Sequence, residues 1–175
     1  MTAQQKKIIK TASKIIEKDG IEKLTMRKLA KQAKLHPNCL YQNFENKNEI
    51  LKHVAKSMTD DVLSETRFEN KNAKEQLIFA VSAFLKRLSE QPHVIDFVFF
   101  NKDIDQILPE DSISIPNHFI GKINAAINER PSNKQVDTQN LFIRILSTIH
   151  GLAMMIKQGM LAYHPQLAEV RLAYI

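Results

Sequence analysis

The stretch of residues 8–54 constrains the fold most, because it holds three short helix-forming segments separated by clear breaks. The first segment carries apolar residues at helical spacing, with lysines mostly off that stripe. Gly20 ends it, since glycine suits the left-handed position that follows many helices. The second begins after Thr25, whose hydroxyl can cap a helix, and the third begins with His36 as cap and Pro37 as first helical residue. These breaks predict a compact three-helix unit.

The third segment has one apolar side and one polar side. Leu40 and Phe44 are four residues apart and are predicted to point inward. The residues predicted to point largely outward are Asn38, Cys39, Tyr41, Gln42 and Asn43. Asn46 with Glu49 three residues later then forms a capping-box pattern, which starts a fourth helix long enough to link two domains.

The composition favours helices along the whole chain. Four Gly, six Pro and no Trp accompany 43% hydrophobic residues, whereas turn-rich sheets need frequent glycine. Helical apolar stripes continue beyond residue 72, and the longest, 136–161, is apolar nearly all round, so it must be covered on more than one side. We therefore predict an all-α protein, with an amino-terminal helix-turn-helix domain at residues 1–60 and a helical body at 61–175.

Cysteine usage and hydropathy bear on the location of the protein. With Cys39 as its single cysteine, the chain cannot form an internal disulfide. The amino terminus is polar and lysine-rich, without the apolar core of a signal peptide. No segment approaches the roughly 20 apolar residues that span a bilayer. We expect a cytoplasmic protein without a membrane partner.

The positive charge is concentrated in the first third of the chain. Residues 1–60 hold thirteen Lys and Arg against six Asp and Glu, near +7, whereas the remainder holds twelve against thirteen, near −1. Duplex phosphates favour clustered cations, so this asymmetry indicates a nucleic-acid surface. A basic helical protein that docks on anionic membranes through residues 1–60 is the alternative that the charge alone leaves open.

Several motifs occur together at regular spacing. In the first third these are Ile9 to Ala12, Gly20, Thr25-Met26-Arg27-Lys28-Leu29-Ala30, Ala33, Leu40-Tyr41, Phe44, Lys47 and Glu49-Ile50-Leu51. As a joint pattern they resemble the amino-terminal domain of TetR/AcrR-type transcriptional regulators. Further on, Thr148-Ile149-His150-Gly151-Leu152-Ala153 followed by Gly159 resembles the dimerisation-helix signature of many members. The resemblance implies a ligand-responsive repressor that binds a palindromic operator in double-stranded DNA as a homodimer.

Two residues depart from the pattern of that family. Lys34 stands in the turn where the family usually has glycine, and a side chain in a left-handed conformation costs roughly 1 kcal/mol. His36 stands where the family usually has a Ser or Thr cap. Either the turn is looser than usual, or both side chains contact phosphate.

The resemblance also implies which residues bind DNA. In a major groove, the amide side chains of Asn38, Gln42 or Asn43 can pair bidentately with adenine. Thr25 at a helix amino terminus suits a phosphate, as do Tyr41 and Lys47 at the matching family positions. The full predicted set is Thr25, Arg27, Lys28, Lys34, His36, Pro37, Asn38, Tyr41, Gln42, Asn43 and Lys47. The alternatives are that Tyr41 is a core aromatic residue and that the lysines form an ordinary solvated face.

The helical body is predicted to dimerise and to bind an effector. The predicted dimer interface comprises Ile145, Thr148, Ile149, Leu152, Ile156 and Gly159. A pocket for a small apolar or amphipathic effector is predicted from Phe84, Phe97, Phe100, Phe119, Met154 and Met155, although such residues are more often core.

Enzymatic activity is not expected. The sequence contains no Gly-rich phosphate loop, no Cys-His nucleophile pair and no cluster with metal-ligand spacing, so we predict no catalytic residue, metal or cofactor. His150 in particular lacks a second histidine at metal-ligand spacing. A helical enzyme with a basic end stays a distant alternative.

Overall fold

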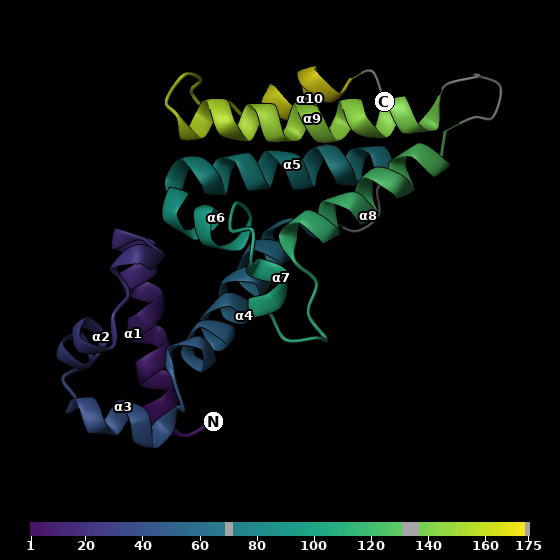
Figure 1. Ribbon diagram of the computed structural model, residues 1–175. Helices are drawn as coiled ribbons and strands as arrows, with labels where there is room; N and C mark the ends of the chain where they lie inside the picture. Colours follow the sequence, from purple (N-terminus) through teal and green to yellow (C-terminus); the bar gives the residue numbers. More distant parts are fainter. Residues whose placement is uncertain (69–71, 131–136, 174–175) are drawn as a thin grey trace. The chain divides into compact units, whose positions relative to one another are not determined.

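The computed structural model describes residues 1–68, 72–130 and 137–173. Within these ranges the protein is built from helices, without a β-strand, which confirms the prediction of an all-α fold (Figure 1). The helices group into two compact units. The first comprises Met1–Asp61 and Gln91–Ser114, and the second comprises Val62–Glu90 and the residues from Ile115 onward.

The first unit is organised around helix α1. Its elements are α1 (Ala3–Asp19), the 3₁₀ turn η1 (Ile21–Lys23), α2 (Met26–Ala33), α3 (Pro37–Asn43), the larger part of α4 (Lys47–Glu65), α6 (Pro92–Val98) and α7 (Ile104–Ile107). The predicted apolar stripe of α1 is buried throughout and contacts α2, α3 and α6. α1 therefore holds the helix-turn-helix segment and the later helix α6 in one core.

Residues 91–114 belong to this first unit, although the sequence analysis counted them in the helical body. Val94, Ile95, Phe97 and Val98 of α6 are buried, and α6 contacts α1. The packing is close, since a Cβ added at Gly20 would lie 3.4 Å from the ring of His93. The boundary predicted at residue 60, between a DNA-binding domain and a helical body, therefore stays a prediction. The packed units divide the chain differently, because residues 91–114 belong to the first unit.

The second unit has helix α5 at its centre. Besides the end of α4, its elements are α5 (Ala73–Glu90), α8 (Ile115–Asn128), α9 (Thr138–Lys157) and α10 (Leu167–Leu172). α5 contacts α8, α9 and α10, and Figure 1 shows α5 and α9 running side by side. Phe84 of α5 and Phe119 of α8 are buried and pack edge to face, with ring centroids 5.2 Å apart. These aromatic rings form the centre of the core.

Helix α9 is shorter than the helix predicted over residues 136–161. α9 spans Thr138–Lys157, within the predicted 136–161, and Asp137 caps it by accepting from the backbone N–H groups of Gln139 and Asn140. Val136 lies outside the described residues. No helix in the described ranges is both long and apolar enough to cross a membrane.

Candidate nucleic-acid interface

Helix α2 begins as its sequence predicts, with Thr25 as its cap. The Thr25 hydroxyl accepts a hydrogen bond from the backbone N–H of Lys28 at 3.1 Å. At the other end, Lys34 has φ 54° and ψ 47°, the left-handed conformation in which glycine is usual. Its side chain is exposed. The turn therefore keeps the left-handed geometry that is regular at this position, at a cost in conformational energy because lysine has a Cβ. It also exposes a lysine side chain between α2 and α3.

Replacing Lys34 with glycine is expected to stabilise the protein. Relief of left-handed strain, about 1 kcal/mol, is partly offset by the larger conformational entropy of glycine in the unfolded chain. Urea unfolding should show a free energy of unfolding higher by roughly 0.5 kcal/mol. Lys31→Gly, an exposed position inside α2, is the matched control and should lower it by about 1 kcal/mol. Equal losses in both variants would contradict the strain at Lys34.

Helix α3 buries one side and displays the other. His36 caps it, its ring Nδ1 accepting from the N–H of Asn38 at 3.3 Å, and Pro37 is its first residue. Leu40 is fully buried, and Phe44 just beyond the helix packs edge to face against the ring of His53. The opposite face presents Asn38, Tyr41 and Gln42, with Tyr41 58% exposed. Tyr41 is therefore not a core aromatic residue of this unit.

Asn43, predicted as a base reader, is placed differently from Asn38 and Gln42. Its side-chain Nδ2 donates to the carbonyl of Cys39 at 2.7 Å, one turn back in the same helix. Its own carbonyl accepts from Nε2 of Gln5 in α1 at 3.2 Å. Asn43 thus fixes the end of α3 against α1. Sequence reasoning did not single out Gln5, although Thr2 and Gln5 carry a capping-box signal at the start of α1.

Lys28 is engaged within the protein. Its Nζ lies 2.7 Å from Oδ2 of Asp19, with both side chains about one-third exposed. The hydrogen bond from Lys28 keeps the pKa of the Asp19 carboxyl below its usual value. The predicted contact of Lys28 with a phosphate would therefore compete with Asp19, whereas Arg27 is exposed. Lys47, at the first position of α4, is half-buried.

The structure buries three of the residues predicted for a dimer interface inside the protomer. Ile145, Ile149 and Leu152 face the core of the second unit. Thr148 and Ile156 are half-buried, and Gly159 is exposed beyond the end of α9. The exposed stripe of the same helix instead contains Ile143, Ser147, His150 and Met154, at spacings of four, three and four residues. Because α9 is apolar nearly all round, the packing of α5 and α8 decides which side is covered.

The residues predicted for an effector pocket are divided between the two packed units. Phe84 and Phe119 pack together in the core of the second unit. Phe97 is buried in the first unit, where Phe100 is half-buried. Met154 and Met155 are exposed on α9. Phe84 and Phe119 are thus the predicted pocket residues that lie in the core of the second unit.

Ile149→Ala tests the inward orientation of that stripe on α9. The side chain is only 1% exposed, so its truncation should lower the free energy of unfolding by about 2–5 kcal/mol through lost burial and a residual cavity. Urea unfolding followed by circular dichroism measures the change. Ile113→Ala, at a position 59% exposed, should change it by less than about 0.5 kcal/mol. A small loss for Ile149→Ala would place this side chain outside the core.

Comparison with known proteins identifies the fold. The family model described as bacterial regulatory proteins, tetR family, matches residues 8–54, the segment that spans α1 to the first part of α4. The sequence has no match among curated proteins.

Solved structures match along nearly the whole chain at low identity. A TetR-like transcriptional regulator from Rhodococcus sp. RHA1 has a TM-score of 0.67 at 13% identity, over 99% of this chain and 93% of that one. BioQ, solved with its natural double-stranded DNA operator, has a TM-score of 0.61 at 21% identity, over 98% of both chains. FadR from Bacillus subtilis, solved with stearoyl-CoA, has a TM-score of 0.62 at 20% identity, over 96% and 95%. At these identities the likeness establishes the fold. The chain therefore has the fold of TetR-family transcriptional regulators, and its residues 8–54 match the model of the tetR family of bacterial regulatory proteins.

Proposed function

We propose that the protein is a DNA-binding transcriptional regulator, a ligand-responsive repressor that binds a palindromic operator as a homodimer. The observation that carries this proposal is the outer face of α3, where Asn38, Tyr41 and Gln42 are exposed within the domain that matches the tetR family. The excess positive charge of residues 1–60 supports it, because phosphate contacts supply much of the affinity for DNA.

The roles of the α3 residues follow from groove geometry. A helix of this kind can enter the major groove, where the amides of Asn38 and Gln42 would pair with adenine. Tyr41 and Lys47 would contact phosphates and fix the orientation of the helix, together with the exposed Arg27 and Lys34. The hydroxyl of Thr25 caps α2, so its contribution to a phosphate contact would come through the helix amino terminus. BioQ, which shares the fold, is solved with its operator.

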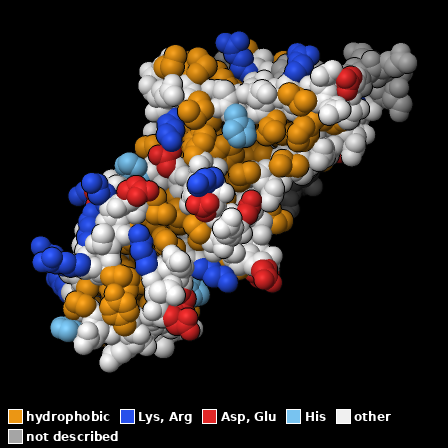
Figure 2. All heavy atoms as spheres, in the orientation of Figure 1, with side chains coloured by type: hydrophobic (Ala, Val, Ile, Leu, Met, Phe, Trp, Pro, Cys, Tyr) orange, Lys and Arg blue, Asp and Glu red, His pale blue; other side chains and the backbone are white. Residues whose placement is uncertain are grey.

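The exposed side of α9 supports the proposal of a homodimer. Its stripe of Ile143, Ser147, His150 and Met154 would pack against the same stripe of a second copy, since a two-fold interface pairs like surfaces. Val170 on α10 is exposed as well. Figure 2 shows hydrophobic side chains gathered on the surface over α9 and α5. A two-fold dimer would present two α3 helices to two half-sites.

An effector would act through the second unit. We propose a small apolar or amphipathic molecule bound between its helices near Phe84 and Phe119, and the stearoyl-CoA complex of FadR supports an amphipathic ligand. α4 is shared, with Lys47–Asp61 in the first unit and the following residues in the second. A ligand that favours one position of α4 over another would change the population that binds DNA.

The decisive experiment is binding of the purified chain to random-sequence duplex DNA across a salt series, together with its mass in solution. A dimer whose affinity falls steeply as salt rises is the expected result. Binding that is absent or independent of salt would overturn the proposal. Selection of an operator from a random library, with a palindromic product expected, then tests the symmetry.

Asp19→Asn should strengthen the binding of DNA. The substitution removes the carboxylate that holds Lys28 and raises the net charge of the first unit by one. Affinity for random duplex should increase by about threefold, and the salt dependence should become steeper by about one phosphate contact. Fluorescence anisotropy at several salt concentrations measures both. Glu22→Gln, which removes an exposed carboxylate from η1, is the control for net charge alone. Equal effects of the two substitutions would mean that Lys28 is not released toward DNA.

A further inference from the structure

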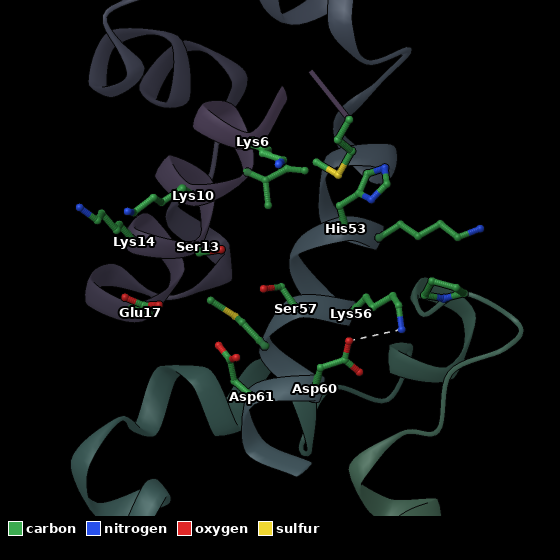
Figure 3. Close-up of a pocket in the computed structure, with 15 residues that line it drawn as sticks. Lys6, Lys10, Ser13, Lys14, Glu17, His53, Lys56, Ser57, Asp60 and Asp61 are labelled. Carbon is green, nitrogen blue, oxygen red and sulfur yellow. Dashed lines mark ion pairs between the residues drawn. The ribbon is translucent and has the colours of Figure 1, made fainter. Parts of the chain in front are cut away.

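The first unit contains a groove between α1 and α4 that the DNA-binding function does not use. Its volume is about 780 Å³, within the range of about 300–1,000 Å³ typical of small-molecule sites. Figure 3 shows α1 and α4 on its two sides. The buried side chains of Ile9 and Met58 supply an apolar floor. The polar residues that line it are Lys6, Lys10, Ser13, Lys14 and Glu17 from α1, and Lys52, His53, Lys56, Ser57, Asp60 and Asp61 from α4.

The charges along the groove are separated. Figure 3 shows Lys6 and His53 toward one end and Glu17, Asp60 and Asp61 toward the other, with Lys10 and Lys14 along α1 between Lys6 and Glu17. Lys56 pairs with Asp60 at 3.3 Å on the same helix, so this pair leaves no net charge. Positive charge therefore predominates where α1 and α4 begin, and the carboxylates gather toward their later turns. A bound molecule with one anionic group would have a single favourable orientation.

We propose that this groove binds an amphipathic organic monoanion, in chemical class a medium-chain carboxylate. The carboxylate would accept charge-assisted hydrogen bonds from Lys6 and Lys52 and one from the ring of His53. The aliphatic chain would cover Ile9 and Met58 and remove their remaining apolar surface from water. This site is separate from the effector region proposed between the helices of the second unit, and it does not depend on that proposal.

The spacing of the charged residues limits the length and the charge of the ligand. Lys6 and Glu17 are eleven positions apart on α1, about 16 Å along a helix that rises 1.5 Å per residue. A ten-carbon chain fits between these ends. A second carboxylate at the far end of such a chain would approach Glu17, and like charges repel. Decanoate should therefore bind, and decanedioate, which has the same chain length, should be rejected.

Isothermal titration calorimetry of the full chain with decanoate and decanedioate tests the site. Decanoate should bind at least about fivefold more tightly than decanedioate. Lys6→Gln should weaken decanoate binding by about fivefold, whereas Lys7→Gln, an exposed lysine outside the groove on the same turn, should leave it unchanged. Ser57→Trp, which fills the groove from the exposed side of α4, should reduce binding by more than about tenfold. Circular dichroism melting checks that each variant is folded.

Several outcomes would overturn the proposal. They are an absence of decanoate binding, equal affinity for the two acids, equal effects of Lys6→Gln and Lys7→Gln, and binding that survives Ser57→Trp. The last would place the ligand elsewhere, for example in the second unit. Because the titration contains no DNA, its failure leaves the regulator proposal untouched, and a failure of DNA binding leaves this site untouched.

Discussion

The double substitution Tyr41→Ala and Lys47→Ala should reduce affinity for duplex DNA by about 100-fold near 100 mM salt. Tyr41 is 58% exposed on the outer face of α3, and Lys47 is the first residue of α4; both are proposed to contact phosphates beside the groove. Loss of the lysine contact should also make the salt dependence shallower by about one unit. Fluorescence anisotropy with labelled random duplex measures both quantities.

Two controls separate these contacts from general effects of charge. Lys18→Ala removes the same charge from an exposed position in the last turn of α1 and should weaken binding by no more than about threefold. Lys47→Arg keeps the charge and should retain most of the affinity. If Lys18→Ala and the double variant lose affinity equally, α3 is not the element that contacts DNA. The double variant should keep its melting temperature, because neither side chain belongs to the buried core.

Ile143→Asp combined with Met154→Asp should convert the proposed dimer into a monomer and reduce affinity for the proposed palindromic operator by about 10²–10⁴-fold. The lost affinity is the gain from binding two linked half-sites, which needs no new contact with DNA. Both side chains lie on the exposed stripe of α9, and two carboxylates on each copy would be buried against two on the other. Sedimentation equilibrium gives the mass, and titration with operator DNA gives the affinity.

Ile113→Asp is the matched control for this surface. Ile113 and Ile143 are exposed to similar extents, 59% and 52%, but Ile113 lies in the first unit. The control should remain dimeric. A double variant of α9 that stays dimeric, with unchanged operator affinity, would move the interface to another face. Affinity for a single half-site should be unchanged in the monomer, because α3 is intact.

Local signals made much of the helix-turn-helix predictable from sequence. The caps at Thr25 and His36 depend on hydrogen bonds that span two or three residues, and the left-handed Lys34 follows from the short link between two helices. The inward positions of Leu40 and Phe44 follow from helical spacing. Such features are determined by residues close together in the chain, so they can be predicted from one sequence.

Features that depend on distant partners could not be read in the same way. The hydrogen bond between Gln5 and Asn43 joins residues 38 positions apart, and α6 packs on α1 from beyond residue 90. On α9, both the covered stripe with Ile149 and the exposed one with Ile143 and Met154 contain large apolar side chains, so spacing alone cannot say which side meets the core. The packing of α5 and α8 against α9 decides which side of the helix is buried.

The amide side chain of Gln5 couples the start of α1 to the end of α3. Its oxygen accepts the N–H of Thr2 at 2.9 Å, and its nitrogen donates to the last carbonyl of α3 at 3.2 Å. Helix ends fray more readily than whole domains unfold, so opening of the first turn of α1 releases the end of α3 without melting the core. The hydrogen bond that fixes the end of the helix proposed to read DNA is therefore no more persistent than the first turn of α1.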